Sequence, residues 1–225
     1  MLAAKNLFSG YKNTTVLRSV DIEVSPKIVT GLVGLNGAGK STLLKTLAGA
    51  VAVSEGKIIL NGEDITALPT QKRLKKGVAL VPEGRLLFSS MTVEDNLKVS
   101  FLKTEGNFKD KLYYVYSLFP DLKRLKNKKA ATLSGGQAQM VAISRAIMCG
   151  AKTLLLDEVT MGLSPKLVGE VFELVKRLSS EIDGVLLTGQ EVERIQKVAT
   201  RLYGIKHGEV FLLKGDLEQI KSKIC

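Results

Sequence analysis

The chain has 225 residues, of which 45% are apolar and 24% are charged. These proportions exclude a disordered, collagen-like or coiled-coil chain, and the length predicts a domain that folds on its own hydrophobic core. The formal net charge of +11 indicates either a polyanionic partner, such as nucleic acid or an anionic membrane surface, or a solvated basic surface without a dedicated partner.

Neither export nor membrane insertion is indicated. The longest charge-free stretch, residues 130–144, contains Ser, Thr, Gln and two glycines, so we expect no membrane-spanning helix. The N-terminal residues lack the basic start and apolar core of a secretory signal. We therefore expect a cytosolic protein in which Cys149 and Cys225 are reduced thiols without a metal-ligand role.

The N-terminal part of the chain favours antiparallel β-structure. Apolar runs at Leu2–Phe8, Val16–Val24 and Gly56–Asn61 have turn residues between them. Elsewhere, short runs rich in Val, Ile and Leu alternate with helical patterns, which predicts an α/β fold with a mainly parallel sheet. The strands of this sheet are expected at Ile28–Val33, Gly77–Val81, Thr153–Leu156 and Val185–Thr188.

A helical segment interrupts this alternation. From about residue 84 to residue 150 the apolar residues follow a helical period, with one helix predicted over Ser134–Met148. We expect an inserted helical subdomain over residues 84–150, within a single domain of residues 1–225. A hairpin around His207 is predicted from the runs Arg201–Ile205 and Glu209–Leu213.

A phosphate-binding loop follows the first strand of the parallel sheet. Residues 34–41 read Gly-Leu-Asn-Gly-Ala-Gly-Lys-Ser, which fits the pattern GxxxxGK[ST] between a strand and a helix. In such a loop, backbone N–H groups and the helix N-terminus point at phosphate oxygens, Lys40 reaches the β and γ phosphates, and Ser41 binds Mg²⁺. The expected nucleotide contacts are Gly34, Leu35, Asn36, Gly37, Ala38, Gly39, Lys40, Ser41 and Thr42.

Two carboxylates follow the apolar strand Thr153–Leu156. A buried strand places Asp157 at the carboxyl edge of the sheet, where ligands bind in open α/β folds, so Asp157 is expected to hold Mg²⁺. Glu158 comes next and can accept a proton from a water that attacks the γ-phosphate. We therefore predict that Glu158 is the general base of nucleotide hydrolysis.

The segment Leu133–Gln137 reads Leu-Ser-Gly-Gly-Gln and begins a predicted helix. Ser134 followed by Gln137 fits a capping box, which is a purely structural role. The functional alternative is a second anion-binding helix N-terminus, with Gly135 and Gly136 allowing close approach to phosphate. One chain with two such sites indicates a dimer in which each of these helices closes over the nucleotide of the other subunit.

These three motifs, in this order and at these spacings, resemble the ATP-binding cassette (ABC) superfamily over essentially the whole chain. The resemblance implies a P-loop NTPase core, ATP and Mg²⁺ as ligands, and ATP hydrolysis coupled to transmembrane transport. It also implies that Tyr11 stacks on adenine and that Glu83, at the Q-loop position, contacts Mg²⁺ and the membrane partner. Ser134 to Gln137 would contact the nucleotide, and residues 161–165 would form the D-loop at the dimer interface.

The stretch from Val81 to Leu97 indicates which kind of ABC protein the chain resembles most. It begins Val-Pro-Glu-Gly-Arg, where most cassettes have Gln in place of Glu83, and it ends Met-Thr-Val-Glu-Asp-Asn-Leu. Together with the Tyr11 region and the turn at residues 61–66, it is similar to the smaller ATP-binding subunit of branched-chain amino acid importers. Urea and amide importers of the same group look nearly alike.

Three residues depart from the family pattern. Val159 stands where the family usually has Pro, and we expect it to loosen the turn that aims Glu158. Gln190 stands at the switch position, where most cassettes have His to sense the γ-phosphate. We include Gln190 among the catalytic residues because it can hydrogen-bond phosphate, although it cannot become cationic. Gly189 stands where this subgroup tends to have an acid.

The leading hypothesis is an ATP-hydrolysing importer subunit for branched-chain or related amino acids, in which ATP-driven dimer closure powers transport. The expected partners are a second ABC ATPase subunit, identical or a paralogue, two transmembrane permease subunits and, indirectly, a periplasmic or extracellular solute-binding protein. We expect a peripheral protein on the cytoplasmic side of the inner or plasma membrane, with no nucleic-acid partner. The alternatives are urea or amide import, export of lipid or lipopolysaccharide, and a soluble ABC protein that acts on nucleic acid or ribosomes, which the length disfavours.

Overall fold

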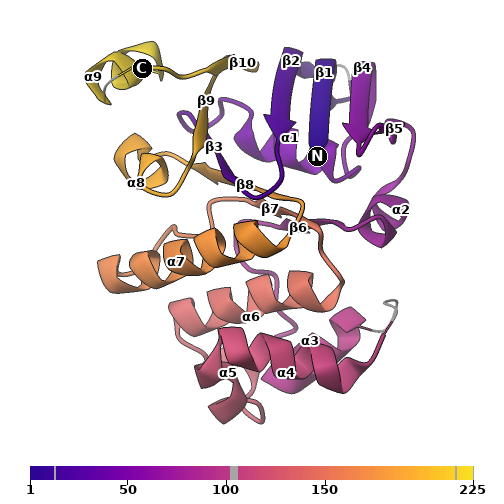
Figure 1. Ribbon diagram of the computed structural model, residues 1–225, viewed down its shortest axis with the longest axis vertical. Coiled ribbons are helices and arrows are strands. Elements are labelled where there is room, and N and C mark those ends of the chain that lie inside the picture. Colours follow the sequence, from indigo (N-terminus) through magenta and orange to yellow (C-terminus); the bar gives the residue numbers. More distant parts are fainter. Residues whose placement is uncertain (13, 102–105, 216, 225) are drawn as a thin grey trace.

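The structure, a computed structural model, describes residues 1–12, 14–101, 106–215 and 217–224. It consists of an antiparallel sheet, a larger sheet with the helices that cover it, and a group of helices at the opposite end of the molecule (Figure 1). Cys225, which was expected to be a reduced thiol, lies outside the described residues.

The antiparallel sheet predicted for the N-terminal part is confirmed. It has the order β2-β1-β4-β5, formed by β1 (Leu2–Tyr11), β2 (Thr14–Val24), β4 (Val53–Leu60) and β5 (Glu63–Asp64). Its buried side chains form one apolar cluster with α1 (Lys40–Leu47). Strands β1 and β2 run farther toward their connecting turn than predicted, because the polar residues there pair through their backbone groups, which an apolar pattern does not report.

The larger sheet has the order β10-β9-β3-β8-β7-β6 and is parallel except for the edge strand β10. This confirms the predicted α/β fold with a mainly parallel sheet. The last two strands form the predicted hairpin, with His207 in its turn. The strands are β3 (Val29–Val33), β6 (Val78–Val81), β7 (Thr153–Leu156), β8 (Gly184–Gly189), β9 (Arg201–Lys206) and β10 (Glu209–Leu212).

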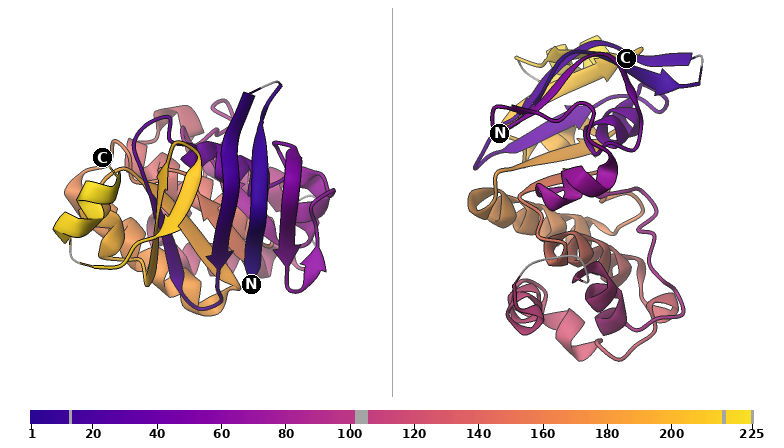
Figure 2. Two further views of the ribbon diagram at one scale, coloured as in Figure 1. Left: turned by 90° about the horizontal axis from the view of Figure 1, so that it is seen from above. Right: turned by 90° about the vertical axis from the view of Figure 1, so that its right-hand side faces the viewer.

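The central strands are buried on both faces, which explains their unbroken apolar sequences. Leu155 and Leu186 belong to the cluster shared with α1 and the antiparallel sheet, whereas their neighbours Leu154, Leu156 and Leu187 belong to the cluster on the other face. Seen from above, the antiparallel sheet lies across the larger one (Figure 2). Because these strands are parallel, their carboxyl ends lie along one edge of the sheet, and the packing on both faces holds them there.

The remaining helices fall into two sets. Those near the larger sheet are α2 (Thr70–Lys75), α7 (Pro165–Glu181), α8 (Val192–Gln196) and α9 (Leu217–Ile224). The helical group contains α3 (Val93–Phe101), α4 (Phe108–Leu118), α5 (Pro120–Arg124), a short 3-10 turn (Ala130–Thr132) and α6 (Gly135–Met148). Within the described ranges, no helix has both the length and the apolar character needed to cross a bilayer.

The helical group shares its core with the larger sheet. Leu97, Val115 and Leu122 from α3, α4 and α5 belong to the same buried cluster as Val141 of α6 and Leu154 of β7. Within this group, α6 therefore lies on the side of α3, α4 and α5 that faces the sheet, as Figure 1 also shows. The continuous core does not mark where the helical subdomain begins or ends, so its predicted boundaries at residues 84 and 150 stay a prediction.

Candidate active site

The phosphate-binding loop connects β3 to α1. Gly37 and Gly39 have φ angles of +79° and +114°, in the left-handed region that residues with side chains rarely adopt. At Gly34, a Cβ would lie 2.5 Å from the carbonyl oxygen of Ile205 in the neighbouring strand β9. These glycines therefore set the path of the loop, and α1 begins directly after it at Lys40.

The ammonium group of Lys40 is held by three oxygens. Its Nζ donates to the carbonyl oxygens of Gly34 at 2.8 Å and Leu35 at 3.0 Å, and it lies 3.1 Å from Oε1 of Glu158. Only 4% of the Lys40 side chain and 9% of the Glu158 side chain are exposed. Because little water screens the two charges, this ion pair joins the loop firmly to the residue after Asp157.

The acidic pair follows β7 as predicted, and its two members lie in different environments. Asp157 is buried, and its Oδ1 accepts a hydrogen bond from Thr188 Oγ1 at 2.9 Å. Glu158 has a φ of +45°, and its backbone N–H donates to the same Thr188 Oγ1 at 3.0 Å. The turn after β7 therefore keeps the Asp157 side chain buried at the end of the strand. It directs the Glu158 side chain toward Lys40 at the phosphate-binding loop.

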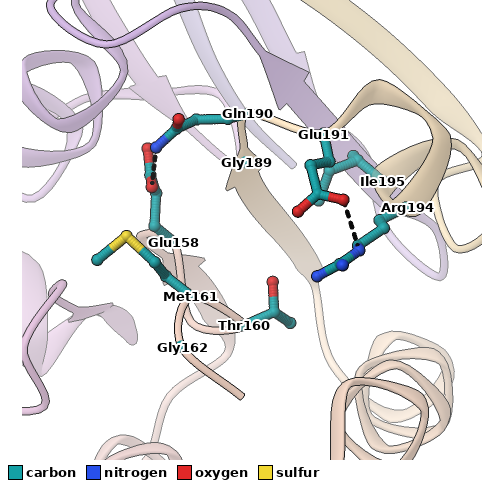
Figure 3. A pocket seen from close by; sticks show the side chains of 9 residues that line it. All are labelled: Glu158, Thr160, Met161, Gly162, Gly189, Gln190, Glu191, Arg194 and Ile195. Carbon is teal, nitrogen blue, oxygen red and sulfur yellow. Dashed lines mark hydrogen bonds and ion pairs between the residues drawn. The ribbon is translucent and has the colours of Figure 1, made fainter. Parts of the chain in front are cut away.

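Gln190 follows β8 and contacts the predicted base. Its Nε2 donates to Oε2 of Glu158 at 2.8 Å, and Figure 3 shows the two side chains facing each other. One oxygen of Glu158 thus contacts Lys40 while the other contacts Gln190. Across the pocket drawn in Figure 3, Arg194 forms an ion pair of 2.6 Å with Glu191.

A cavity of about 400 Å³ opens at this edge of the sheet. A second cavity of about 210 Å³, drawn in Figure 3, shares Glu158, Met161 and Gln190 with it. The structure thus brings much of the predicted site together, from the loop, the Q-loop position, the acidic pair and the switch position. The larger cavity is lined by Val16, Asn36, Gly37, Gly39, Lys40, Ser41, Thr42, Glu83, Glu158, Met161 and Gln190.

Several predicted residues do not line this cavity. Leu35 and Ala38 border a separate pocket beside β9, and Gly34 is buried at the start of the loop. Asp157 lies buried next to Glu158. Tyr11, which the resemblance assigns to adenine stacking, stands at the end of β1 with 46% of its surface exposed, so that role stays a prediction.

The Leu-Ser-Gly-Gly-Gln segment also lies outside the cavity of its own chain. Ser134 Oγ accepts from the backbone N–H of Gln137 at 3.3 Å, and Gln137 Oε1 accepts from the N–H of Ser134 at 3.0 Å, which confirms the predicted capping box. Gly136 lets Leu167 of α7 approach, because a Cβ there would lie 2.6 Å from Leu167 Cδ1. A nucleotide contact by Gly135 or its neighbours would need a second subunit and stays a prediction.

The structure gives a physical reason for one of the departures and shows the surroundings of another. Val159 is buried in the apolar core, and the Glu158 N–H beside it donates to Thr188. The expected loosening of the turn by Val159 stays a prediction. At Gly189, a Cβ would lie 2.7 Å from Cδ1 of Ile195 in α8. An acidic side chain at position 189 would therefore displace Ile195.

Sequence reasoning missed two residues of this site. Thr188 could have been found from the sequence, because it is a hydroxyl residue at the end of an apolar strand and close to Gln190. A buried hydroxyl there needs a hydrogen-bond partner, which in the structure is Asp157. Val16 had no such signal, because an apolar residue in a strand cannot be distinguished from a core residue by pattern alone.

Comparison with known proteins agrees with this geometry. The family described as ABC transporter matches residues 17–161. The chain is 38% identical to the high-affinity branched-chain amino acid transport ATP-binding protein BraG of Pseudomonas aeruginosa, over 94% of this chain and 91% of that protein. It is 37% identical to the probable branched-chain amino acid transport ATP-binding protein LivF of Archaeoglobus fulgidus, over 93% of this chain and 90% of that protein.

The similarity extends to an exporter component and to a solved structure. The chain is 31% identical to the lipopolysaccharide export system ATP-binding protein LptB of Haemophilus influenzae, over 99% of this chain and 93% of that protein. A crystal structure of the ADP conformation of an ATP-binding cassette from an ABC transporter superposes with a TM-score of 0.83 at 26% identity, covering 99% of this chain and 93% of that one. The chain therefore belongs to the ABC transporter family, as an ATP-binding subunit that hydrolyses ATP.

Proposed function

We propose that this ATPase is the smaller ATP-binding subunit of an importer for branched-chain or related amino acids. The identity of 37% and 38% to two proteins named for branched-chain amino acid transport, over more than nine-tenths of the chain, supports the substrate class. The catalytic part rests on one observation. Lys40, Glu158 and Gln190, from three separate segments, meet at one cavity on the carboxyl edge of the sheet.

In the proposed mechanism, the loop and the start of α1 bind the phosphates of ATP through backbone N–H groups and Lys40 Nζ. Lys40 pairs with Glu158 at 3.1 Å, so an arriving γ-phosphate replaces that carboxylate as the partner of the ammonium group. Glu158 is then available to accept a proton from the attacking water. Gln190 keeps its hydrogen bond to Oε2 and orients the carboxylate.

Mg²⁺ would be held by Ser41, Glu83 and Asp157 together with phosphate oxygens and water. Ser41 and Glu83 line the cavity, and all three side chains offer oxygen, the ligand type that Mg²⁺ prefers. The described ranges contain no group of three or more His, Cys, Asp or Glu side chains that would form a cage of protein ligands alone. This set fits a cation held largely by the nucleotide, which when bound neutralises charge on the phosphoryl group.

ATP binding is proposed to close a dimer with an identical or paralogous ATPase subunit. Ser134 stands at the N-terminus of the 14-residue helix α6, but it lines no part of the cavity that contains Lys40 in its own chain. Because a helix N-terminus favours a phosphate, this segment of one subunit would bind the nucleotide held by the other. The D-loop, residues 161–165, begins with Met161 at the edge of the cavity, where a partner would meet it.

A permease subunit is proposed to dock in a groove between α2, β6 and the helical group. The groove has a volume of about 340 Å³, and its lining includes Leu74, Leu86, Ala142 and Cys149. Such an apolar groove accepts one face of a short amphipathic helix. This docking would place the subunit peripherally on the cytoplasmic side of the membrane, with a solute-binding protein acting through the permease. Large apolar side chains are exposed in the same region at Leu86, Phe88, Met91 and Val99.

Export of lipid or lipopolysaccharide is a second candidate function. It is supported by the identity of 31% to LptB over 99% of this chain. This identity is lower than the 38% and 37% to BraG and LivF. Urea or amide import would use the same ATPase and the same groove, because the ATPase subunit does not contact the solute.

Transport by reconstituted proteoliposomes tests these candidates. Vesicles that contain the chain, its permease subunits and its solute-binding protein should take up labelled leucine, isoleucine or valine when ATP is supplied to the ATPase. Uptake should be lost with Lys40→Ala. Uptake of urea or a short amide, but not of these amino acids, would contradict the substrate class. ATP-dependent extraction of lipid without uptake would contradict import.

A further inference from the structure

Thr188 occupies a fully buried position near the end of β8. It pairs in register with Leu32 of β3, and it directly follows Leu187, which pairs with Leu156 at the end of β7. Its side chain is inaccessible to solvent. The hydroxyl group is therefore out of contact with water and needs hydrogen-bond partners within the protein.

The hydroxyl of Thr188 joins the two carboxylate residues that follow β7. Oγ1 lies 2.9 Å from Oδ1 of Asp157, 3.0 Å from the backbone nitrogen of Glu158 and 3.4 Å from the carbonyl oxygen of Leu156. A backbone N–H can only donate, so Glu158 donates to Oγ1. The single hydroxyl hydrogen then goes to the nearer acceptor, which is Asp157.

Glu158 needs such support because of its backbone conformation. Its φ of +45° lies in the left-handed region, which a residue with a side chain adopts only where its surroundings hold it. The bond to Thr188 fixes the amide of Glu158, and Gln190 holds the carboxylate at 2.8 Å. The end of β8 therefore holds this residue at both its backbone and its side chain.

We propose that Thr188 is a positioning residue for ATP hydrolysis, which aligns Asp157 and Glu158 through one hydroxyl group. The proposal rests on the roles proposed above for those two residues. Thr188 occupies Oδ1 of Asp157, whereas Oδ2 has no hydrogen-bond donor within the described ranges, so Oδ2 is the oxygen available to a cation or its water. Because one hydroxyl makes both bonds, Asp157 and Glu158 keep a fixed relation to each other.

Three variants separate positioning from packing. Thr188→Val keeps the shape of the side chain but removes both hydrogen bonds, and Thr188→Ser restores the hydroxyl. Thr153→Val is the matched control. Thr153 is a buried threonine of β7 whose hydroxyl has no hydrogen-bond partner among the described residues, so this substitution changes packing alone.

Partners of metal-ligating side chains typically contribute about 10- to 100-fold to activity or metal affinity. Thr188→Val should therefore lower kcat about 10- to 100-fold and raise the Mg²⁺ concentration for half-maximal rate. The KM for ATP should change less than about twofold, because the contacts of the phosphate-binding loop remain. In the protein without nucleotide, hydrogen exchange of the Glu158 amide, followed by NMR, should accelerate about tenfold or more. Thr188→Ser should recover most of each effect, and Thr153→Val should show none.

Two results would overturn the proposal. One is an unchanged kcat in Thr188→Val, whether or not the exchange of the Glu158 amide changes. The other is an equal loss of activity and melting temperature in Thr188→Val and Thr153→Val, which would show a packing effect common to buried threonines. Glu158→Gln separates this proposal from the proposed function. Normal hydrolysis by Glu158→Gln removes the base on which both rest, whereas slow hydrolysis by Glu158→Gln beside normal hydrolysis by Thr188→Val refutes the positioning role alone.

Discussion

Glu158 lies between two partners that occupy both of its carboxylate oxygens. Lys40 contacts Oε1 and Gln190 contacts Oε2, so each carboxylate oxygen already has a side-chain partner while the nucleotide is absent. A nearly buried ion pair is screened little by solvent, and a nucleotide must therefore compensate for its loss with contacts of its own to Lys40. In the proposed mechanism, this arrangement couples release of Glu158, the proposed base, to arrival of the γ-phosphate.

Lys40→Ala should lower the affinity for ATP by about 100-fold or more, because hydrogen bonds to charged groups contribute about 1.5–3 kcal/mol each and an ammonium group can donate several to the phosphates. Tyr11→Ala should weaken binding by about tenfold or less, because an aromatic stack contributes only about 0.5–1.5 kcal/mol. Titration calorimetry with ATP measures both. Lys45→Ala, in the same helix but away from the cavity, is the control and should bind normally. An ATP affinity of Lys40→Ala equal to that of Lys45→Ala would show that the nucleotide binds elsewhere.

Local spacing explains which site residues the sequence could predict. The phosphate-binding loop directly follows β3, and Asp157 and Glu158 directly follow β7. The role of each of these residues could therefore be predicted from its position after a strand. The pairing of Lys40 with Glu158 joins two segments that are distant in the chain, and no local pattern reports it. The same holds for Thr188, whose hydroxyl bonds a neighbouring strand.

Among the secondary-structure elements, the buried parallel strands were predicted best. Their apolar runs are unbroken because both faces are covered, and the runs match β3, β6, β7 and β8 within one or two residues. The short elements α2 and β5 were not predicted, because a six-residue helix or a two-residue strand leaves almost no periodic pattern. The capping box of α6 was predicted from Ser134 and Gln137 because caps depend on residues close in sequence.

The start of α6 has a structural role that must be separated from its proposed contact with nucleotide. Ser134→Ala should lower the free energy of unfolding by about 1 kcal/mol, the usual value of an N-cap, as measured by denaturant unfolding. Asn107→Ala is the matched control, because Asn107 caps α4 by accepting from the backbone N–H of Lys109 at 2.8 Å. Both variants should lose similar stability, but only Ser134→Ala should also slow ATP hydrolysis by the dimer. Equal hydrolysis by the two variants would leave Ser134 as a cap alone.

At the scale of the whole molecule, a short segment after β6 joins the cavity proposed to bind nucleotide to the groove proposed to bind the permease. Glu83 lines the cavity and Leu86 lines the groove, only three residues later. Gly84, Arg85 and Leu86 all have positive φ angles, of +81°, +66° and +45°. Residues with side chains hold such angles only at a cost, so this segment stores strain between the two sites. A change at Glu83 therefore has a direct covalent route to the groove.

Phe88→Asp should uncouple the ATPase from its permease while leaving the fold intact. The residue is 43% exposed, and its ring centroid lies 4.8 Å from Cζ of Arg145, a lining residue of the groove. Basal ATP hydrolysis should persist and the melting temperature should fall by less than about 4 °C, whereas stimulation by the permease should be lost. Tyr113→Asp, on α4 with 77% of its surface exposed, is the control and should keep the stimulation. A much lower melting temperature of Phe88→Asp would identify Phe88 as a core residue instead.

Cys149 reports on the same groove through its thiol. Burial raises the pKa of the Cys149 thiol, although the nearby charges of Arg145 and Lys111 oppose this shift. Because the thiolate is the reactive form, alkylation should be slow near neutral pH and should accelerate as the pH rises past the ordinary thiol pKa of about 8.5. In a Cys225→Ser background, docking of the permease should slow alkylation at a fixed pH. Equal rates with and without the permease would contradict docking in this groove.

Glu158→Gln tests the role of this residue in hydrolysis most directly. Removal of a general base typically lowers the rate by about 10²–10⁴-fold while ground-state contacts remain. In a single-turnover experiment with Mg²⁺ and ATP, phosphate release by Glu158→Gln should therefore slow by about that factor. The same samples should bind ATP at least as tightly as the natural protein, because glutamine no longer competes with the γ-phosphate for Lys40. Phosphate release at a near-normal rate would contradict the assignment and would show that another group accepts the proton.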